Sequence, residues 1–142
     1  MTLYLDTSAL VKLYVAEAGS AEVAAAVNGA AAVCSSRVAY PEARAALARR
    51  QRERALTAAA LRRAVAALDR DLSSYVIVEL RAAVAQRAGA LAERHRLRGF
   101  DAIHLASALE LKELLGSAPR FLTFDARQAE AAALVGLVGR SE

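Results

Sequence analysis

The sequence predicts an α/β fold in which a central parallel sheet is flanked by helices. Short apolar segments, typical of buried strands, alternate along the chain with longer segments of helical periodicity. A helical connection between successive strands is what a parallel sheet requires. The 142 residues contain no linker, internal repeat or low-complexity tract, and this length suits one core. We therefore expect a single domain over 1–142.

Five segments are predicted as strands. The apolar segment 2–5 stands almost at the start of the chain and is followed by an acidic residue, and 121–125 ends in one. The segment 75–80, Tyr-Val-Ile-Val-Glu-Leu, has the highest β-branched content of the five. The other two are 31–35 and a last short segment near 135–138. The expected sheet is therefore five-stranded and parallel.

Capping and breaking residues place the helices between these strands. Thr7 or Ser8 can cap a helix directly after the first strand, and Asn28-Gly29 closes an alanine-rich helix over 21–27. Pro41 suits a first helical turn because it lacks the amide hydrogen that would have no partner there. The remaining helices are expected at about 41–54, 57–68, 82–97, 102–115 and 127–133. The part from 42 to 68 reads as an arginine-rich helical hairpin inserted between two strands.

Composition and charge limit the classes of function. The net charge of +4 fits a nucleic-acid or acidic-protein partner without requiring one. The one cysteine, Cys34, excludes an internal disulfide framework. The N-terminus lacks the basic segment of a secretory signal, and the longest uncharged stretch, 23–36, is too short to span a bilayer. We expect a cytoplasmic protein without a membrane partner.

Four acidic residues stand where a strand ends or a helix begins: Asp6, Glu42, Asp101 and Asp125. In a parallel sheet with helices on both faces, these places share one edge, so the four carboxylates can converge on one crevice. An acid at a helix start is common, because it satisfies free amides and the helix dipole, and this explains Glu42 or Asp101 taken alone. An acid at the tip of a buried strand is rarer, because desolvation disfavours its charge.

Carboxylates within a few ångströms of one another cannot all stay ionised without a cation. Oxygen ligands of this kind suit Mg²⁺ or Mn²⁺ and not Zn²⁺. Such a site can activate a water molecule and offset the charge on a phosphodiester. The four acids are therefore the candidate catalytic and metal-binding residues, and His104, one helical turn after Asp101, is interpreted as a supporting or packing residue.

The arginines of the predicted helix 41–54 have two interpretations. Arginine is a good helix former, and an exposed arginine-rich face needs no ligand. A basic stripe beside a phosphodiester-cleaving site would, however, position a polynucleotide without reading its sequence. On the second interpretation Arg44, Arg49 and Arg50 are candidate RNA-binding residues.

Four motifs resemble the PIN-domain ribonucleases of the VapC (virulence-associated protein C) toxin type, and the resemblance covers essentially the whole chain. Each motif is weak alone, but their order and spacing suit a chain of this length. The motifs are Leu5-Asp6-Thr7-Ser8-Ala9-Leu10, Tyr40-Pro41-Glu42-Ala43-Arg44, Phe100-Asp101-Ala102-Ile103-His104-Leu105-Ala106 and Leu122-Thr123-Phe124-Asp125.

The resemblance implies a Mg²⁺- or Mn²⁺-dependent endoribonuclease that is the toxin of a toxin–antitoxin pair. Asp6, Glu42 and Asp101 would be the core acids, and Asp125 would complete the set through a water molecule. Ser8 and Thr123 match the hydroxyl positions of the family, and Thr7 is a further supporting residue. The implied partners are an RNA substrate, a cognate antitoxin that inserts a segment into the acidic groove, and a second copy of the chain in a homodimer.

Two other classes of function remain open at this point. A receiver-type phosphoacceptor or aspartyl-phosphate domain also combines a parallel sheet, acids at strand tips and Mg²⁺. The receiver type requires an acidic pair and a lysine after a late strand, and the aspartyl nucleophile type requires a second aspartate where this chain has Ser8. A catalytically inactive PIN-like binding module is the other alternative, and it is favoured if the acids do not converge.

Overall fold

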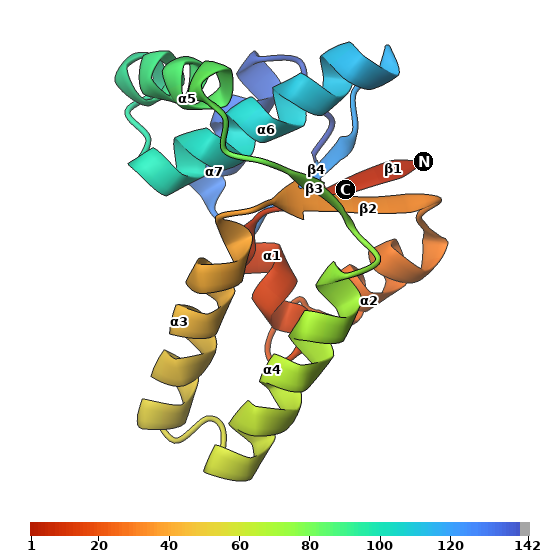
Figure 1. The fold of residues 1–142 in the computed structure, drawn as a ribbon, viewed down its shortest axis with the longest axis vertical. Helices are drawn as coiled ribbons and strands as arrows, with labels where there is room; N and C mark the ends of the chain where they lie inside the picture. Colours follow the sequence, from red (N-terminus) through yellow and green to blue (C-terminus); the bar gives the residue numbers. More distant parts are fainter. Residues whose placement is uncertain (140–142) are drawn as a thin grey trace.

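A parallel sheet of four strands lies at the centre of the fold (Figure 1). A computed structural model describes residues 1–139, and within them the strands have the order β3-β2-β1-β4. The strands are β1 (Thr2–Leu5), β2 (Ala32–Ser36), β3 (Val76–Val78) and β4 (Arg120–Leu122). Leu3 of β1 pairs with Val33 on one side and with Arg120 on the other. The predicted α/β class with a parallel sheet is confirmed.

Helices cover both faces of the sheet. They are α1 (Thr7–Leu10), the 3₁₀ helix η1 (Val11–Leu13), α2 (Ser20–Gly29), α3 (Ala39–Arg52), α4 (Ala58–Leu72), α5 (Ala82–His95), α6 (Gly99–Leu115) and α7 (Ala126–Leu134). Figure 1 shows α5, α6 and α7 above the sheet and α1 to α4 below it. None of the helices in the described part is long and apolar enough to cross a membrane.

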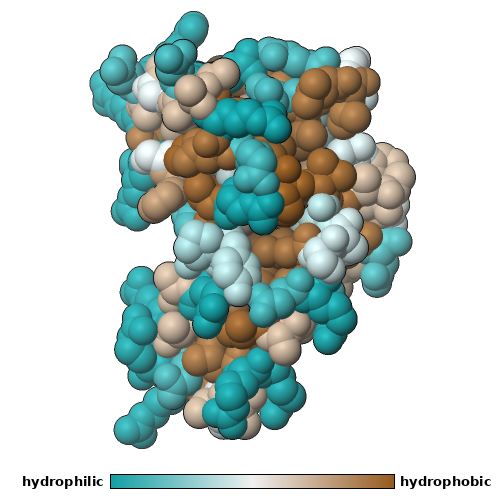
Figure 2. Space-filling view, in the orientation of Figure 1, coloured by the Kyte–Doolittle hydropathy of each residue, from teal (hydrophilic) through white to brown (hydrophobic). Residues whose placement is uncertain are grey.

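Alternating side chains of the strands divide the core between these two layers. Tyr4 and Phe121 are buried in the cluster formed with α5, α6 and α7, and their rings stack at 5.2 Å between centroids. Leu3, Leu5 and Leu122 are buried in the cluster below the sheet. Both faces of β1 are therefore apolar, as expected for a central strand of a parallel sheet. Hydrophilic residues cover most of the lower part of the molecule, over α3 and α4 (Figure 2).

The prediction of a fifth strand at 135–138 is wrong for the described residues. The segment makes a single bridge, between Val138 and Arg120, in which the Phe121 amide donates to the Val138 carbonyl at 2.7 Å. Helix α7 continues to Leu134, and Gly136 has a φ of +83°, which an extended strand cannot contain. The chain therefore reaches the edge of β4 at one residue only.

Gly19 is required where helix α2 begins beside Phe124. It has a φ of +91°, and a Cβ at this position would lie 2.5 Å from Phe124 Cε1. We expect Gly19→Ala to lower the free energy of unfolding by about 2 kcal/mol, because backbone strain and steric overlap add. Urea unfolding checks this value. Gly29→Ala is the control, because a Cβ there meets nothing within 4 Å and should be neutral or stabilising. Equal effects of both substitutions would contradict the steric explanation.

Candidate active site

The four acidic residues predicted from the sequence all lie at the carboxyl edge of the sheet. Asp6 follows β1 and caps α1, and Asp125 follows β4 and caps α7. Glu42 and Asp101 stand in the first turns of α3 and α6. Because the strands are parallel, their carboxyl ends and the starts of the following helices meet at this edge.

Asp6 is the most buried of these acids, with 3% of its surface exposed. Its carboxylate accepts hydrogen bonds from Ser8 Oγ at 2.7 Å, from the Ala9 amide at 3.1 Å and from Thr123 Oγ1. Burial raises the pKa of Asp6 although these bonds and the nearby His104 act to lower it. An ionised Asp6 is therefore poorly compensated by the protein alone, and a bound cation would stabilise it.

Glu42 is connected through His104 to the sheet. Glu42 Oε1 accepts from Thr7 Oγ1 at 2.7 Å and lies 2.9 Å from His104 Nε2. His104 Nδ1 lies 2.8 Å from the hydroxyl of Tyr4, and burial holds the pKa of Tyr4 well above its usual value. Because a carboxylate oxygen only accepts, the tautomer with its hydrogen on Nε2 fits both contacts: Nε2 donates to Glu42, and Nδ1 accepts from the Tyr4 hydroxyl. His104 is thus a positioning residue, as its place near Asp101 suggested.

We expect Tyr4→Phe to lower the free energy of unfolding by about 1–2 kcal/mol. The substitution keeps the stacked ring but leaves His104 Nδ1 buried without a donor. Chemical unfolding at neutral pH measures the change. Tyr40→Phe is the matched control: the Tyr40 hydroxyl accepts an exposed 3.4 Å bond from Arg44, so its loss should change stability by less than about 0.5 kcal/mol. A Tyr4→Phe protein as stable as the control would show that this hydrogen bond is not needed.

Asp101 and Asp125 line an open cleft of about 520 Å³. The other residues lining it are Arg98, Ala126, Arg127 and Glu130. The pKa of Asp101 is raised, first by burial and then by the charges of Asp125, Asp6 and Glu42. The charges of the other three acids therefore act on Asp101. Gln128 connects α7 to α6, because its Nε2 donates to the backbone carbonyl of Asp101 at 2.7 Å.

The donor set has the chemistry of a site for a hard divalent cation. All four candidate ligands are carboxylates, and the hydroxyls of Ser8 and Thr123 surround the buried one. Within residues 1–139, no three His, Cys, Asp or Glu side chains are placed closely enough to hold a metal ion as they stand. The residues fit Mg²⁺ or Mn²⁺ in charge and atom type, and an ion would offset the repulsion that raises the pKa of Asp101.

Comparison with protein families matches residues 3–134 to the family described as the PIN domain. This chain is a PIN-domain protein. It is also 49% identical over 111 residues to "Ribonuclease VapC45" from Mycobacterium tuberculosis (strain CDC 1551 / Oshkosh), an alignment that covers 75% of this chain and 74% of the relative. It therefore belongs to the VapC branch of the family. Membership removes the receiver-type alternative, because the acids belong to a PIN fold.

Solved structures share the fold of this PIN domain. One is the crystal structure of Mycobacterium tuberculosis VapC20, described as a sarcin-ricin loop cleaving toxin, with a TM-score of 0.69 and 21% identity over 96% of each chain. Another is a toxin–antitoxin complex from Klebsiella pneumoniae, with a TM-score of 0.63 and 19% identity, over 89% of this chain and 88% of the other. At sequence identities this low, the similarity to these two structures shows a shared fold only.

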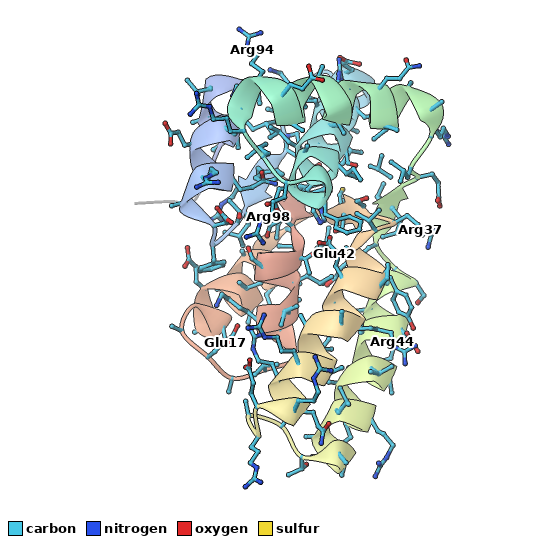
Figure 3. The ribbon with its side chains drawn as sticks, turned by 90° about the vertical axis from the view of Figure 1, so that its left-hand side faces the viewer. Glu17, Arg37, Glu42, Arg44, Arg94 and Arg98 are labelled. Carbon is cyan, nitrogen blue, oxygen red and sulfur yellow. The ribbon has the colours of Figure 1, made fainter. Side chains whose placement is uncertain are left out.

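The arginines predicted to bind RNA lie along α3, away from the acids of the PIN domain. Figure 3 shows Arg44 well below Glu42, which lies in the middle of the molecule. Arg49 forms an ion pair with Glu53 at 2.8 Å, and Arg50 forms one with Glu17 at 3.3 Å. These two positive charges are therefore already partly compensated within the chain.

Sequence reasoning overlooked three side chains of this site: Tyr4, Arg98 and Arg127. In the sequence, Tyr4 is not distinguished from the apolar residues of its strand. Its hydroxyl is hydrogen-bonded to His104, which is 100 positions away in the sequence. Arg98 and Arg127 each stand within three residues of a candidate acid, and both line the cleft. That proximity in sequence was the available signal for the two arginines.

Proposed function

We propose that this PIN domain is a metal-dependent endoribonuclease that acts in the cytoplasm as the toxin of a toxin–antitoxin pair. The observation that carries the proposal is the set of four carboxylates at one sheet edge, where burial and then the charges of the other three acids raise the pKa of Asp101. Such a group is suited to a divalent ion and a phosphodiester. The identity with a VapC ribonuclease supports RNA as the substrate.

In this proposal Asp6, Glu42 and Asp101 would hold the ion, and Asp125 would complete the set through a water molecule. Ser8 and Thr123 orient the Asp6 carboxylate, and Thr7 with His104 orients that of Glu42. A bound Mg²⁺ or Mn²⁺ would supply the Lewis acidity that activates water and offsets charge on the scissile phosphate. The hydrogen bonds keep the carboxylates in place while the RNA chain enters and leaves.

The partners follow from the relatives. The complex from Klebsiella pneumoniae is described as a toxin–antitoxin complex, which supports a cognate antitoxin for this chain. A homodimer is supported by exposed leucines at the ends of two helices, which are Leu114 and Leu115 of α6 and Leu134 of α7. Light scattering of the purified chain should give twice the monomer mass of 15.0 kDa.

Incubation of total RNA with the purified chain tests the function. We expect discrete fragments in the presence of Mg²⁺ or Mn²⁺ and intact RNA in the presence of EDTA. Expression of the chain alone should arrest growth of the host, and co-expression of its antitoxin should restore it. A folded protein that is stabilised by the metal ion but leaves every RNA intact would overturn the proposal in favour of a binding module.

A further inference from the structure

Two arginines stand beside the acids of the cleft. Arg98 and Arg127 line the cleft together with Asp101 and Asp125, yet neither forms an ion pair within residues 1–139. By contrast, Arg49 and Arg50 of α3 are paired with glutamates. An arginine without an acidic partner keeps its full charge and all its donors for a ligand.

The basic surface continues from this cleft to the end of helix α5. An adjoining hollow shares Arg127 and Glu130 with the cleft and is also lined by Arg96. We call Arg96, Arg98 and Arg127 the cleft arginines, and all three are exposed. Figure 3 shows Arg98 in the middle of the molecule near Glu42, whereas Arg94, which borders the same hollow, extends outward into solvent.

Arg96 occupies a backbone conformation that favours glycine. It caps the C-terminus of α5 with φ 54° and ψ 43°, in the left-handed region. This conformation destabilises a residue with a Cβ by about 1 kcal/mol, and glycine is the usual choice at such a helix end. Arg54, after α3, has a similar φ of 65°, so what distinguishes Arg96 is its place in the hollow beside Arg127.

Charge balance explains why cations are needed here. Acidic side chains repel an RNA phosphate, and the cleft is lined by three of them, Asp101, Asp125 and Glu130. Arg98 and Arg127 place two positive charges among these acids.

We propose that the cleft arginines bind the phosphates of the RNA strand next to the scissile bond. Arg98 and Arg127 hold the phosphates closest to the acids, and Arg96 holds the strand where it crosses the end of α5. The contacts are made to the backbone, so they position RNA without selecting its sequence. This inference rests on the proposed ribonuclease function and moves the RNA-binding surface from α3 to the cleft.

Binding of a labelled polyuridylate of about 20 nucleotides tests the inference, in EDTA so that the RNA stays intact. The variant combines Arg96→Gly, Arg98→Gln and Arg127→Gln. We expect about tenfold weaker binding, and a salt dependence of log K reduced by about 2, since each single-strand phosphate contact contributes about 0.7. The melting temperature should stay unchanged or rise, because glycine relieves the strain at position 96.

A matched control removes three exposed arginines of α4, outside the cleft and the hollow, through Arg62→Gln, Arg63→Gln and Arg70→Gln. It lowers the net charge by the same amount and should keep RNA affinity within about twofold. Equal losses in both variants would show that net charge alone attracts RNA and would overturn the inference. Polyglutamate serves as a probe for an acidic protein partner. A cleft variant that keeps RNA affinity but no longer binds polyglutamate would also overturn the inference, because the surface would then bind an acidic protein.

The two levels of the proposal fail in different ways. If the cleft variant binds and cleaves RNA as the unmodified chain does, the cleft arginines are not the RNA surface and the ribonuclease function stands. If the unmodified chain neither binds nor cleaves RNA with Mg²⁺ or Mn²⁺, the proposed function fails and the inference fails with it.

Discussion

Asp101→Asn is expected to abolish RNA cleavage and, at the same time, to stabilise the metal-free protein. Asparagine removes a carboxylate that we propose as a ligand of the ion, so the rate of cleavage should fall by about three orders of magnitude. The carboxylate of Asp101 is disfavoured by burial and by Asp125, Asp6 and Glu42, all of which raise its pKa. Its position in the first turn of α6 favours negative charge, but the raised pKa shows that the unfavourable effects are larger.

Thermal unfolding and cleavage assays together check this prediction. In EDTA at neutral pH, the melting temperature of Asp101→Asn should exceed that of the unmodified chain by about 1–3 °C. Added Mg²⁺ or Mn²⁺ should stabilise the unmodified chain and leave the variant unchanged, because binding to the folded state alone produces the shift. An active variant, or one that the ion stabilises as strongly as the unmodified chain, would remove Asp101 from the metal site.

Thr123→Val is expected to lower the free energy of unfolding by about 3 kcal/mol at neutral pH. The Thr123 hydroxyl donates to the buried Asp6 carboxylate and accepts from the Asp125 amide at 3.1 Å. Valine has a similar shape but provides neither bond. A hydrogen bond to a buried carboxylate stabilises the folded state more than a hydrogen bond between neutral groups. Most of the lost stability is therefore that of the bond from Thr123 to ionised Asp6.

The effect of Thr123→Val should depend on pH in a defined direction. The pKa of Asp6 is already raised in the folded protein, and the bond from Thr123 lowers it, so valine raises it further. A folded-state pKa above the unfolded value means that stability is present at low pH and is lost as pH rises through the folded pKa. The difference between variant and unmodified chain should therefore grow between acidic and neutral pH in EDTA.

Thr57→Val provides the control for this pH dependence. Thr57 caps α4 and accepts a bond from the Ala60 amide at 3.0 Å, with no carboxylate involved. Its replacement should lower stability by about 1 kcal/mol at every pH. Unfolding by urea across the pH range gives both curves, and a pH-independent loss for Thr123→Val would show that Asp6 does not depend on its hydroxyl.

Local pattern was sufficient for the layers of the fold and for the place of the acids. The alternation of apolar strands with helical segments determines a parallel sheet, because only a crossover connection joins parallel neighbours. Asp6 and Asp125, beyond strand ends, and Glu42 and Asp101, in first helical turns, must then reach the same edge. Their place at one edge of the sheet follows from topology, so the sequence by itself could predict it.

The tertiary structure decided everything that depends on which residues meet across the chain. The predicted fifth strand is reduced to one bridge at Val138. Helix α7 extends to Leu134, and Gly136 has a positive φ, so the residues before Val138 are not extended. Arg50 forms an ion pair with Glu17, 33 positions away, whereas Arg98 and Arg127 line the cleft with Asp101 and Asp125. Periodicity reports only the face on which a side chain lies. The partner it meets there is set by the packing of distant elements, and this packing determines which arginines form ion pairs.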